Sequence, residues 1–500
     1  MRTLPWSRGA AEKAWRQAEC GTCRDRQREI DRLERQVEQA ERRLEHADGE
    51  IKQLRERVKA LEGELEKAHR AGKRQAAPFS KGKREPSGRP PGRRPGEAYG
   101  RKARRAVPTQ IDREIEVFLP EACPHCGGPL SECETADQYH EELPEPRPVV
   151  TRFRVHVGRC SDCGRHVQGR HPEQTSDALG VAAVQVGPRA TALVCYLNKV
   201  IGASMGKTAA ILQTVSGITL TTGGISQALD RVARKSLPTY EALVEAVRHS
   251  PAVTADESGW KVGGDLHWLW VFVTKLVTVY RIQPGRGFKE AAEVLGSDFC
   301  GVLERDGWAP YRQFTQAAHQ SCLAHLTRRC REMLDIATDE DGQIPLTVER
   351  LLKDGLEVRD RRDAGELAPA AVAAEVEGLE QRLDEVLGEL DQTQHNGNRR
   401  LLKHLGRERD AIFTFLRQTG VQATNWQAEQ DVRPAVVNRK VWGGNRSPDG
   451  AHTQEVLASV LRTAQKQGQN PRHILAELLR SPTPVVAPLL PVVAVPPAPG

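Results

Sequence analysis

The order of short apolar runs between residues 252 and 317 constrains the fold of this chain more than any other feature. Strand-like runs are followed by helical spacing, then by another strand-like run and a second helix. The predicted strands cover 252–257, 266–274, 276–284 and 301–306, and the predicted helices cover 287–296 and 311–317. A meander of three strands, a helix and a returning strand predicts an α/β domain whose first strand is central and whose fourth strand is its neighbour.

Two of these strand-like runs each carry an aspartate. Asp256 lies in AVTADESGW and Asp306 in GVLERDGW. A lone aspartate in such a run is usually a surface carboxylate, but two on neighbouring strands can share a hard cation such as Mg²⁺. Two such cations can cut and rejoin phosphodiester bonds. The strand order is that of a ribonuclease-H-like core, so we expect a metal-dependent site there.

Length and composition set the broad class of the protein. The chain has 500 residues, which predicts several domains, and a net charge of +7 that is unevenly spread. It has no apolar run long enough for a membrane span and no apolar signal-peptide core at its start, so we expect a cytoplasmic protein and no membrane partner. In a reducing compartment, its 11 cysteines favour metal ligands or buried thiols over disulfides.

Residues 24–70 carry a heptad pattern. Apolar residues alternate in steps of three and four along the seam Ile30, Leu33, Val37, Ala40, Leu44, Ala47, Ile51, Leu54, Val58, Leu61 and Leu65. β-Branched residues at the first seam position with leucine at the second favour a parallel dimer. The pattern predicts a coiled coil between two copies of the chain; a single solvated helix is the alternative. The nearby pair Cys20 and Cys23 has no assigned role.

A basic segment follows the heptads. Residues 71–110 are rich in Pro, Gly, Lys and Arg and have few apolar residues to bury, which predicts a disordered linker. Its cations suit DNA phosphates, although a solvated linker without a specific partner has the same composition. The candidate DNA contacts are Lys81, Lys83, Arg84, Arg89, Arg93 and Arg94.

Two CxxC pairs indicate a zinc site within residues 111–175. Cys123 and Cys126 form the first pair, and Cys160 and Cys163 form the second. Four thiolates at this spacing are typical of a structural zinc ribbon that binds one Zn²⁺, the alternative being four unrelated buried thiols.

Residues 176–248 show helical spacing with a short glycine-containing turn between two helices. This arrangement indicates a helix-turn-helix, with Arg231 on the polar side of the second helix, or else ordinary helical packing. Further along, residues 331–410 predict a helical insertion, 448–480 predict C-terminal helices, and the proline-rich 481–500 predicts a disordered tail. Glu429 lies in a helix-like context between the insertion and the C-terminal helices.

Taken together, several motifs resemble one family. They are PFSKGK, CPHCGG, DESGW, HWLWV, DGWAPY, CLAHLTRR and AEQDVRPAVVNRK. The chain resembles bacterial transposases of the insertion-sequence-sixty-six type, which have a zinc finger and a DDE core. It has Ser258 where members commonly have threonine, Trp426 where they often have asparagine, and Gln430 where they commonly have arginine.

The resemblance implies that Asp256, Asp306 and Glu429 are a catalytic triad that binds two Mg²⁺ ions. It implies cleavage at transposon ends, transfer of the 3′-hydroxyl ends to target DNA, a bacterial, nucleoid-associated location, and possible help from accessory proteins of the same element. Arg328 follows Asp306 on a predicted helix and is a candidate DNA contact, with packing or a surface role as the alternative. Arg433, one turn beyond Glu429, is a candidate partner of a phosphate or of a carboxylate. The catalytic domain would then comprise 249–330 and 411–447, and residues 1–70 would hold the coiled coil. A non-catalytic DNA-binding regulator derived from a transposase, and a nuclease that cuts without joining, remain alternatives.

Overall fold

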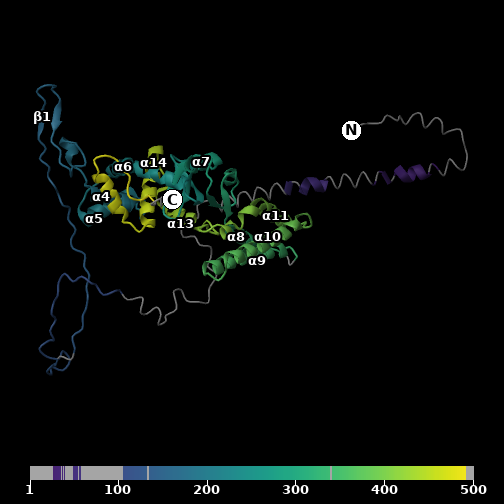
Figure 1. The fold of residues 1–500 in the computed structure, drawn as a ribbon, viewed down its shortest axis with the longest axis horizontal. Coiled ribbons are helices and arrows are strands. Elements are labelled where there is room, and N and C mark those ends of the chain that lie inside the picture. The colour runs from purple at the N-terminus through teal and green to yellow at the C-terminus, as the bar shows by residue number, and fades with distance from the viewer. Residues whose placement is uncertain are drawn as a thin grey trace, which may run out of the picture. The chain divides into compact units, whose positions relative to one another are not determined.

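The computed structural model describes scattered positions between residues 26 and 57 and then residues 105–131, 134–337 and 340–490. The chain divides into two compact units, Met1–Arg104 and Arg105–Gly500. The described positions of the first unit are helical (Figure 1). Its seam residues are largely exposed on the single chain: Ile30, Leu33, Val37, Ile51 and Leu54. The six candidate DNA contacts between Lys81 and Arg94 lie outside the described residues, as do Cys20 and Cys23.

A five-stranded sheet forms the centre of the second unit. Its strands occur in the order β5-β4-β3-β6-β7, so the first strand in sequence, β3, is central. β4 runs antiparallel to β3 and β5, whereas β6 runs parallel to β3 and β7. As the sequence predicted, the fourth strand-like run lies beside the first. The strands are β3 (Ala252–Val262), β4 (Asp265–Val273), β5 (Thr278–Gln283), β6 (Val302–Arg305) and β7 (Ala318–Ser321).

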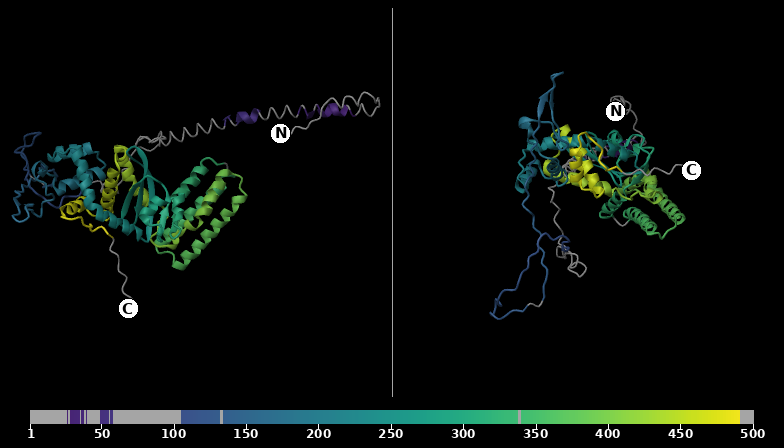
Figure 2. Two further views of the ribbon diagram at one scale, coloured as in Figure 1. Left: turned by 90° about the horizontal axis from the view of Figure 1, so that it is seen from above. Right: turned by 60° about the vertical axis from the view of Figure 1, so that its left-hand side comes forward.

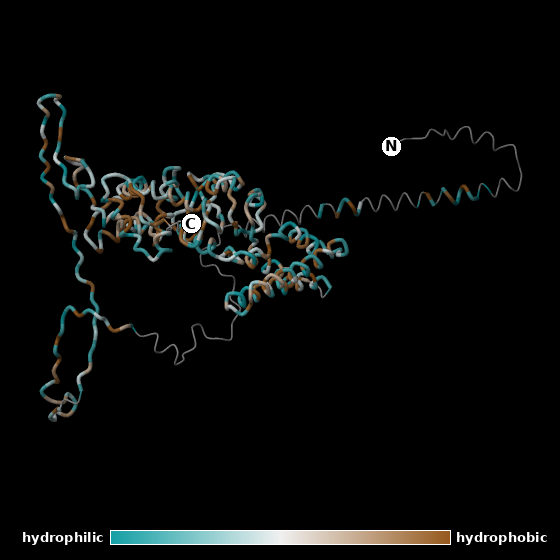
Figure 3. Tube along the Cα trace, in the orientation of Figure 1, coloured by the Kyte–Doolittle hydropathy of each residue, from teal (hydrophilic) through white to brown (hydrophobic). Residues whose placement is uncertain are grey.

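Helices cover both faces of this sheet because successive residues of each strand point to opposite faces. Val253 and Ala255 of β3 belong to the core that includes α6 and α7. Trp260 and Val262, on the other face, pack with α13. Apolar residues gather among these elements (Figure 3). The helices are α4 (Pro188–Lys199), α5 (Met205–Ser216), α6 (Thr222–Arg248), α7 (Phe288–Leu295) and α13 (Trp426–Trp442).

The C-terminal helix α14 (Pro448–Lys466) lies against the outer strand β5. Its side chains accept hydrogen bonds from alternate backbone N–H groups of that strand. Glu455 accepts from Ile282 at 2.6 Å, Ser459 from Tyr280 at 2.9 Å and Thr463 from Thr278 at 3.1 Å. Every fourth residue of α14 is about 6 Å further along the helix, and every second residue of β5 is about 6.7 Å further along the strand. The two spacings nearly match, so the same contact recurs three times. α15 (Pro471–Arg480) packs on α4 and α6.

A bundle of helices is inserted between β7 and α13. Its helices contact one another in sequence and lie side by side (Figure 2), around an apolar core of their own. The predicted insertion began at residue 331, whereas the first helix of the bundle already starts at Leu323. The bundle comprises α8 (Leu323–Leu334), α9 (Gln343–Asp363), α10 (Pro369–Leu387) and α11 (Asn396–Glu408), and α12 (Thr414–Arg417) follows it.

Two predicted segments differ from the structure. The helix expected over 311–317 is a short 3₁₀ helix (Ala309–Gln313) followed by the unpredicted strand β7. The tail expected to be disordered from residue 481 is packed as far as residue 490: Leu489 is buried, and Ala487 N donates to Thr239 Oγ1 at 2.9 Å. Residues 491–500 lie outside the described part.

The predicted helix-turn-helix corresponds to α5 and α6, joined by a turn at Gly217, whose φ is 67°. α6 is 27 residues long, and its buried side continues into the core against the sheet. None of the helices in the described residues has the length and apolar character needed to cross a membrane.

Candidate active site

The three carboxylates singled out in the sequence come from three elements of the sheet domain. Asp256 lies on β3, on the face that α13 covers. Asp306 directly follows β6, the parallel neighbour of β3. Glu429 lies in the first turn of α13, and α13 packs on β3. The fold therefore directs all three acids toward the middle of the central strand, where its parallel neighbour β6 ends.

The carboxylates influence one another electrostatically. The pKa of Asp256 is raised to about 7, first by burial and the charge of Glu257, and further by the charges of Asp306 and Glu429. In the described part of the chain, no lysine or arginine forms an ion pair with Asp256 or Asp306. Glu429 has a histidine nearby: the Nε2 atom of His325 lies 3.8 Å from its Oε1. The site therefore concentrates negative charge that the chain itself does not neutralise.

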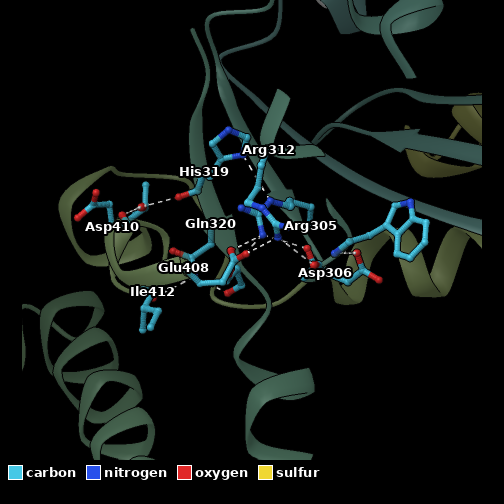
Figure 4. A network of polar contacts seen from close by, with 12 residues as sticks. Arg305, Asp306, Arg312, His319, Gln320, Glu408, Asp410 and Ile412 are labelled. Carbon is cyan, nitrogen blue, oxygen red and sulfur yellow. Dashed lines mark hydrogen bonds and ion pairs between the residues drawn. The ribbon is translucent and has the colours of Figure 1, made fainter. Parts of the chain in front are cut away.

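The segment that carries Asp306 is held by backbone and side-chain contacts. Trp308 N donates to Asp306 Oδ1 at 2.9 Å, and Arg305 Nη1 donates to Asp306 O at 3.1 Å. Arg305 is itself buried and paired with the buried Glu408 of α11. Figure 4 shows Arg305 and Arg312 both directed at Glu408, and Arg312 Nη1 lies 3.0 Å from Glu408 Oε1. The helical bundle is thus tied to the strand end that positions Asp306.

Burial raises the pKa of Glu408, but the charge of Arg305 and hydrogen bonds from Ser321 and Arg305 outweigh it, and the pKa is lowered. The sequence did not single out Glu408. It lies in a charged helix about a hundred residues from Arg305 and Arg312, and no motif or residue spacing connects it with them.

A second acidic residue, Glu257, lies on the opposite face of β3. Tyr311 Oη donates to its Oε2 at 2.6 Å, and Arg286 Nε donates to its Oε1 at 2.7 Å. The guanidinium of Arg286 lies between the rings of Trp268 and Trp308, with its Cζ 4.6 Å and 4.0 Å from their centroids. This stack links Glu257 to Trp308, whose N–H binds Asp306. Glu257 could have been found from the sequence, because it directly follows Asp256. No motif in the sequence points to Arg286.

The three carboxylates suit a hard cation, because they provide oxygen ligands. Only Glu429 has a cationic side chain nearby among the described residues, that of His325. Among the described residues, no three His, Cys, Asp or Glu side chains are grouped tightly enough to hold a metal ion as they stand. Near Glu429, both polar side-chain atoms of the buried Asn425 and the Nδ1 atom of His325 lack hydrogen-bond partners. These unused polar atoms leave the site able to accept further ligands.

The two CxxC pairs each form a turn of the kind that zinc sites use. Cys123 N donates to Gly128 O and Cys160 N to Arg165 O, and the turns place Gly127 and Gly164 at φ of 70° and 68°. The second pair follows β1 (Val157–Arg159) and precedes β2 (His166–Gln168), which form an antiparallel ribbon. Hydrogen bonds from the backbone of His125 and Cys126 lower the pKa of Cys123, and those from Cys163 and Asp162 lower the pKa of Cys160. The structure does not group the four thiols, so their joining by zinc stays a prediction.

Three predicted DNA contacts fall within the described residues, and all three are exposed. Arg231 lies on α6, Arg328 on α8, and Arg433 on α13 one turn after Glu429. Their role in DNA contact remains a prediction.

Comparison with known proteins bears on the same domain. The model of a family described as "Transposase IS66 family" matches residues 183–453, which include all three carboxylates. An uncharacterized protein of Sinorhizobium fredii (strain NBRC 101917 / NGR234), y4qI, is 22% identical over 76% of this chain and 74% of its own length. A second from that strain, y4jD, is 24% identical over 53% of this chain and 56% of its own. A third, y4jO, is 30% identical over 19% of this chain.

Proposed function

Because the chain belongs to the IS66 transposase family, we propose that it binds transposon ends, cleaves a phosphodiester bond there, and transfers the freed 3′-hydroxyl to target DNA. The arrangement of Asp256, Asp306 and Glu429 carries the proposal: they are half-buried acids on β3, directly after β6 and on α13, and the charges of Asp306 and Glu429 raise the pKa of Asp256. The sheet order, with the acids at the central strand, the end of its parallel neighbour and a covering helix, supports a ribonuclease-H-like core.

Asp256, Asp306 and Glu429 are the residues that would hold two Mg²⁺ ions. When bound, such ions activate the attacking hydroxyl and stabilise the leaving oxygen of an in-line displacement at phosphorus. The chain contributes the geometry. The contacts of Trp308 and Arg305 hold Asp306, and the packing of α13 on β3 brings Glu429 near enough to Asp256 for its charge to act on that carboxyl.

Cationic residues beside the carboxylates would position the DNA. His325 faces Glu429, and the exposed Arg328 and Arg433 lie one turn along from these residues on their helices. Phosphate contacts of this kind orient a duplex without reading its sequence. In this proposal, the zinc ribbon, the helices α5 and α6 and the basic segment 71–110 supply further contacts with transposon ends and target DNA. The heptad seam joins two copies of the chain, and accessory proteins of the same element are possible partners.

The test replaces each carboxylate in turn by its amide: Asp256→Asn, Asp306→Asn and Glu429→Gln. Each variant should lose about a thousandfold or more in cleavage of labelled transposon-end DNA with Mg²⁺, because a lost ligand removes several kcal/mol of transition-state stabilisation. Binding to the ends should persist. Asp265→Asn, at the exposed start of β4, is the matched control and should cut at the wild-type rate.

Including a supercoiled target in the same assay separates the candidate functions. A wild-type protein that binds the ends without cutting them would be a regulator, and one that cuts without joining would be a nuclease. Near wild-type cleavage by any of the three amide variants would remove that residue from the metal site.

A further inference from the structure

One face of the helical bundle carries cations without acidic partners. On α11, Arg400, Lys403 and Arg407 are exposed and follow one another at steps of three and four, so they lie along one side of the helix. Leu401, Leu402 and Leu405 form the opposite, buried side. From Arg400 to Arg407 the helix rises about 10 Å.

The two ends of α11 fix where this face lies. Gly397, at its start, lies near Met333 at the end of α8, since a Cβ atom there would be 3.5 Å from Met333 Cε. His404, near its end, lies against Gly307, where a Cβ atom would come within 2.5 Å of the imidazole. α11 therefore runs back along α8 toward the segment of Asp306. Arg400 and Arg407 stand one turn before and one turn after His404.

α8 adds a further cation to this face. Burial and then the charge of Arg400 lower the pKa of Arg329, and the charge of Arg329 contributes to the lowered pKa of the partly buried His404. Arg329, Arg400 and His404 are therefore close together. We refer to Arg329, Arg400, Lys403 and Arg407 as the cationic stripe.

Several other arginines of the bundle region are paired with acids, whereas Arg328, Arg350 and Arg399 have no ion pair among the described residues. The pairs include Arg331 with Glu349, Arg361 with Glu375, Arg382 with Asp354, and Arg409 with Asp384. No ion pair found among the described residues involves a member of the stripe. Like charges held together on one side of a helix destabilise a fold slightly, so this unpaired row of cations favours a surface that a polyanion neutralises.

We propose that the cationic stripe binds the phosphate backbone of the duplex that leads to the cleavage site. This proposal rests on the proposed function, because it takes the carboxylates as the place where DNA is cut. A duplex carries one negative charge per about 1.7 Å of its axis, so a 10 Å row of cations spans a few phosphates of the strand it faces. Because the stripe ends beside Gly307, those phosphates lie within about one helical turn of the scissile bond.

The experiment measures the affinity of the full-length protein for duplex DNA against salt concentration, without divalent cations. The test variant combines Arg400→Ala, Lys403→Ala and Arg407→Ala. The control variant combines Arg359→Ala, Arg361→Ala and Arg382→Ala, which removes the same charge from helices of the same bundle whose arginines have acidic partners.

Each lost phosphate contact lowers the slope of log K against log salt by about 0.9, so the stripe variant should lower it by about 2–3 and weaken binding at least tenfold at about 0.1 M salt. The control should change the slope by less than about 1. Thermal melting should show no loss of stability in the stripe variant, because its three side chains are exposed. The charge-conserving variant Arg400→Lys with Arg407→Lys should keep the wild-type slope.

Neutral methylphosphonates placed one at a time along the duplex locate the contact. At a few consecutive positions, a methylphosphonate should weaken DNA binding by the wild type. At those same positions it should not weaken DNA binding by the stripe variant. A slope equal to that of the wild type in the stripe variant would overturn the proposal, even if the protein cuts DNA. A reduced slope in a protein that does not cut DNA would support the stripe and reject the transposase chemistry.

Discussion

At the scale of single residues, the environment of Asp256 disfavours the charged form of its carboxyl. Its pKa of about 7, against an ordinary 3.8, means that the folded chain resists ionisation of this carboxyl. Below about pH 4 the group is protonated in both states. Between about pH 4 and pH 7 the carboxyl ionises in the unfolded chain and stays protonated in the folded chain, so stability falls as the pH rises through that window.

We therefore predict that Asp256→Asn stabilises the protein in Mg²⁺-free buffer at pH 8. The difference in unfolding free energy between the variant and the wild type should grow by about 2–3 kcal/mol from pH 5 to pH 8, because a tenfold change in a proton-binding constant corresponds to about 1.4 kcal/mol. Urea titration at several pH values measures it, and Asp265→Asn should show a constant difference. Millimolar Mg²⁺ at pH 8 should stabilise the wild type and leave Asp256→Asn unchanged. A difference independent of pH would place Asp256 in a solvated environment.

The sequence predicted some of these residues better than others. Asp256 and Asp306 could be placed near each other because their strand-like runs implied neighbouring strands, and the structure puts β3 beside β6. Glu429 could be singled out only by resemblance, since a helical bundle separates it from both in the chain. The ion pair of Glu408 with Arg305 left no local trace, because a charged residue in a charged helix resembles its solvated neighbours.

At the scale of elements, apolar alternation located β4, β5 and β6 to within two residues, whereas β3 runs five residues beyond its predicted end at residue 257. It could not locate β7, whose sequence is AHQS. That strand is buried through polar contacts: Gln320 donates to Ile412 O at 3.1 Å and accepts from Phe415 N at 2.8 Å. A short polar strand whose partners come from a later part of the chain gives no hydrophobic signal.

The contact of α14 with β5 likewise depends on polar groups. Thr463 accepts from Thr278 N at 3.1 Å and donates to Thr278 O at 3.2 Å, so its hydroxyl satisfies both backbone groups of a residue on the outer strand. Outer strands otherwise present unpaired groups on which other chains can assemble.

We predict that Thr463→Val destabilises the protein by about 1–3 kcal/mol, because it keeps the shape of the side chain and leaves two buried backbone groups unpaired. Denaturant unfolding measures the loss, and light scattering should show earlier aggregation on heating. Thr347→Val is the control: its exposed hydroxyl bonds to Gln343 O within α9, and it should change stability by less than about 0.5 kcal/mol. Equal effects of the two substitutions would show that the strand edge does not depend on this hydroxyl.

At the scale of the whole molecule, the chain consists of two compact units. The helical positions of the first unit expose a row of apolar side chains, each of them 45–62% accessible. A row of this kind is stable in water when a second helix covers it, which favours a dimer through this unit.

We predict that Leu33→Lys with Leu54→Lys converts the full-length protein from dimer to monomer, because two lysines would enter the seam. Gln53→Lys with Glu56→Lys adds positive charge off the seam and should leave the dimer intact. Size-exclusion chromatography with light scattering measures the mass. A seam variant that kept the mass of a dimer would show that the copies associate elsewhere.

The position of Glu429 beyond the bundle has a consequence for protein synthesis. Asp256 and Asp306 leave the ribosome long before α13 and α14, so an interrupted chain carries two of the three acids and an uncovered outer strand. In the proposed function, such a fragment has its DNA-contacting surfaces but not its full metal site. If the proposed function holds, cutting therefore requires synthesis of the chain at least through α13.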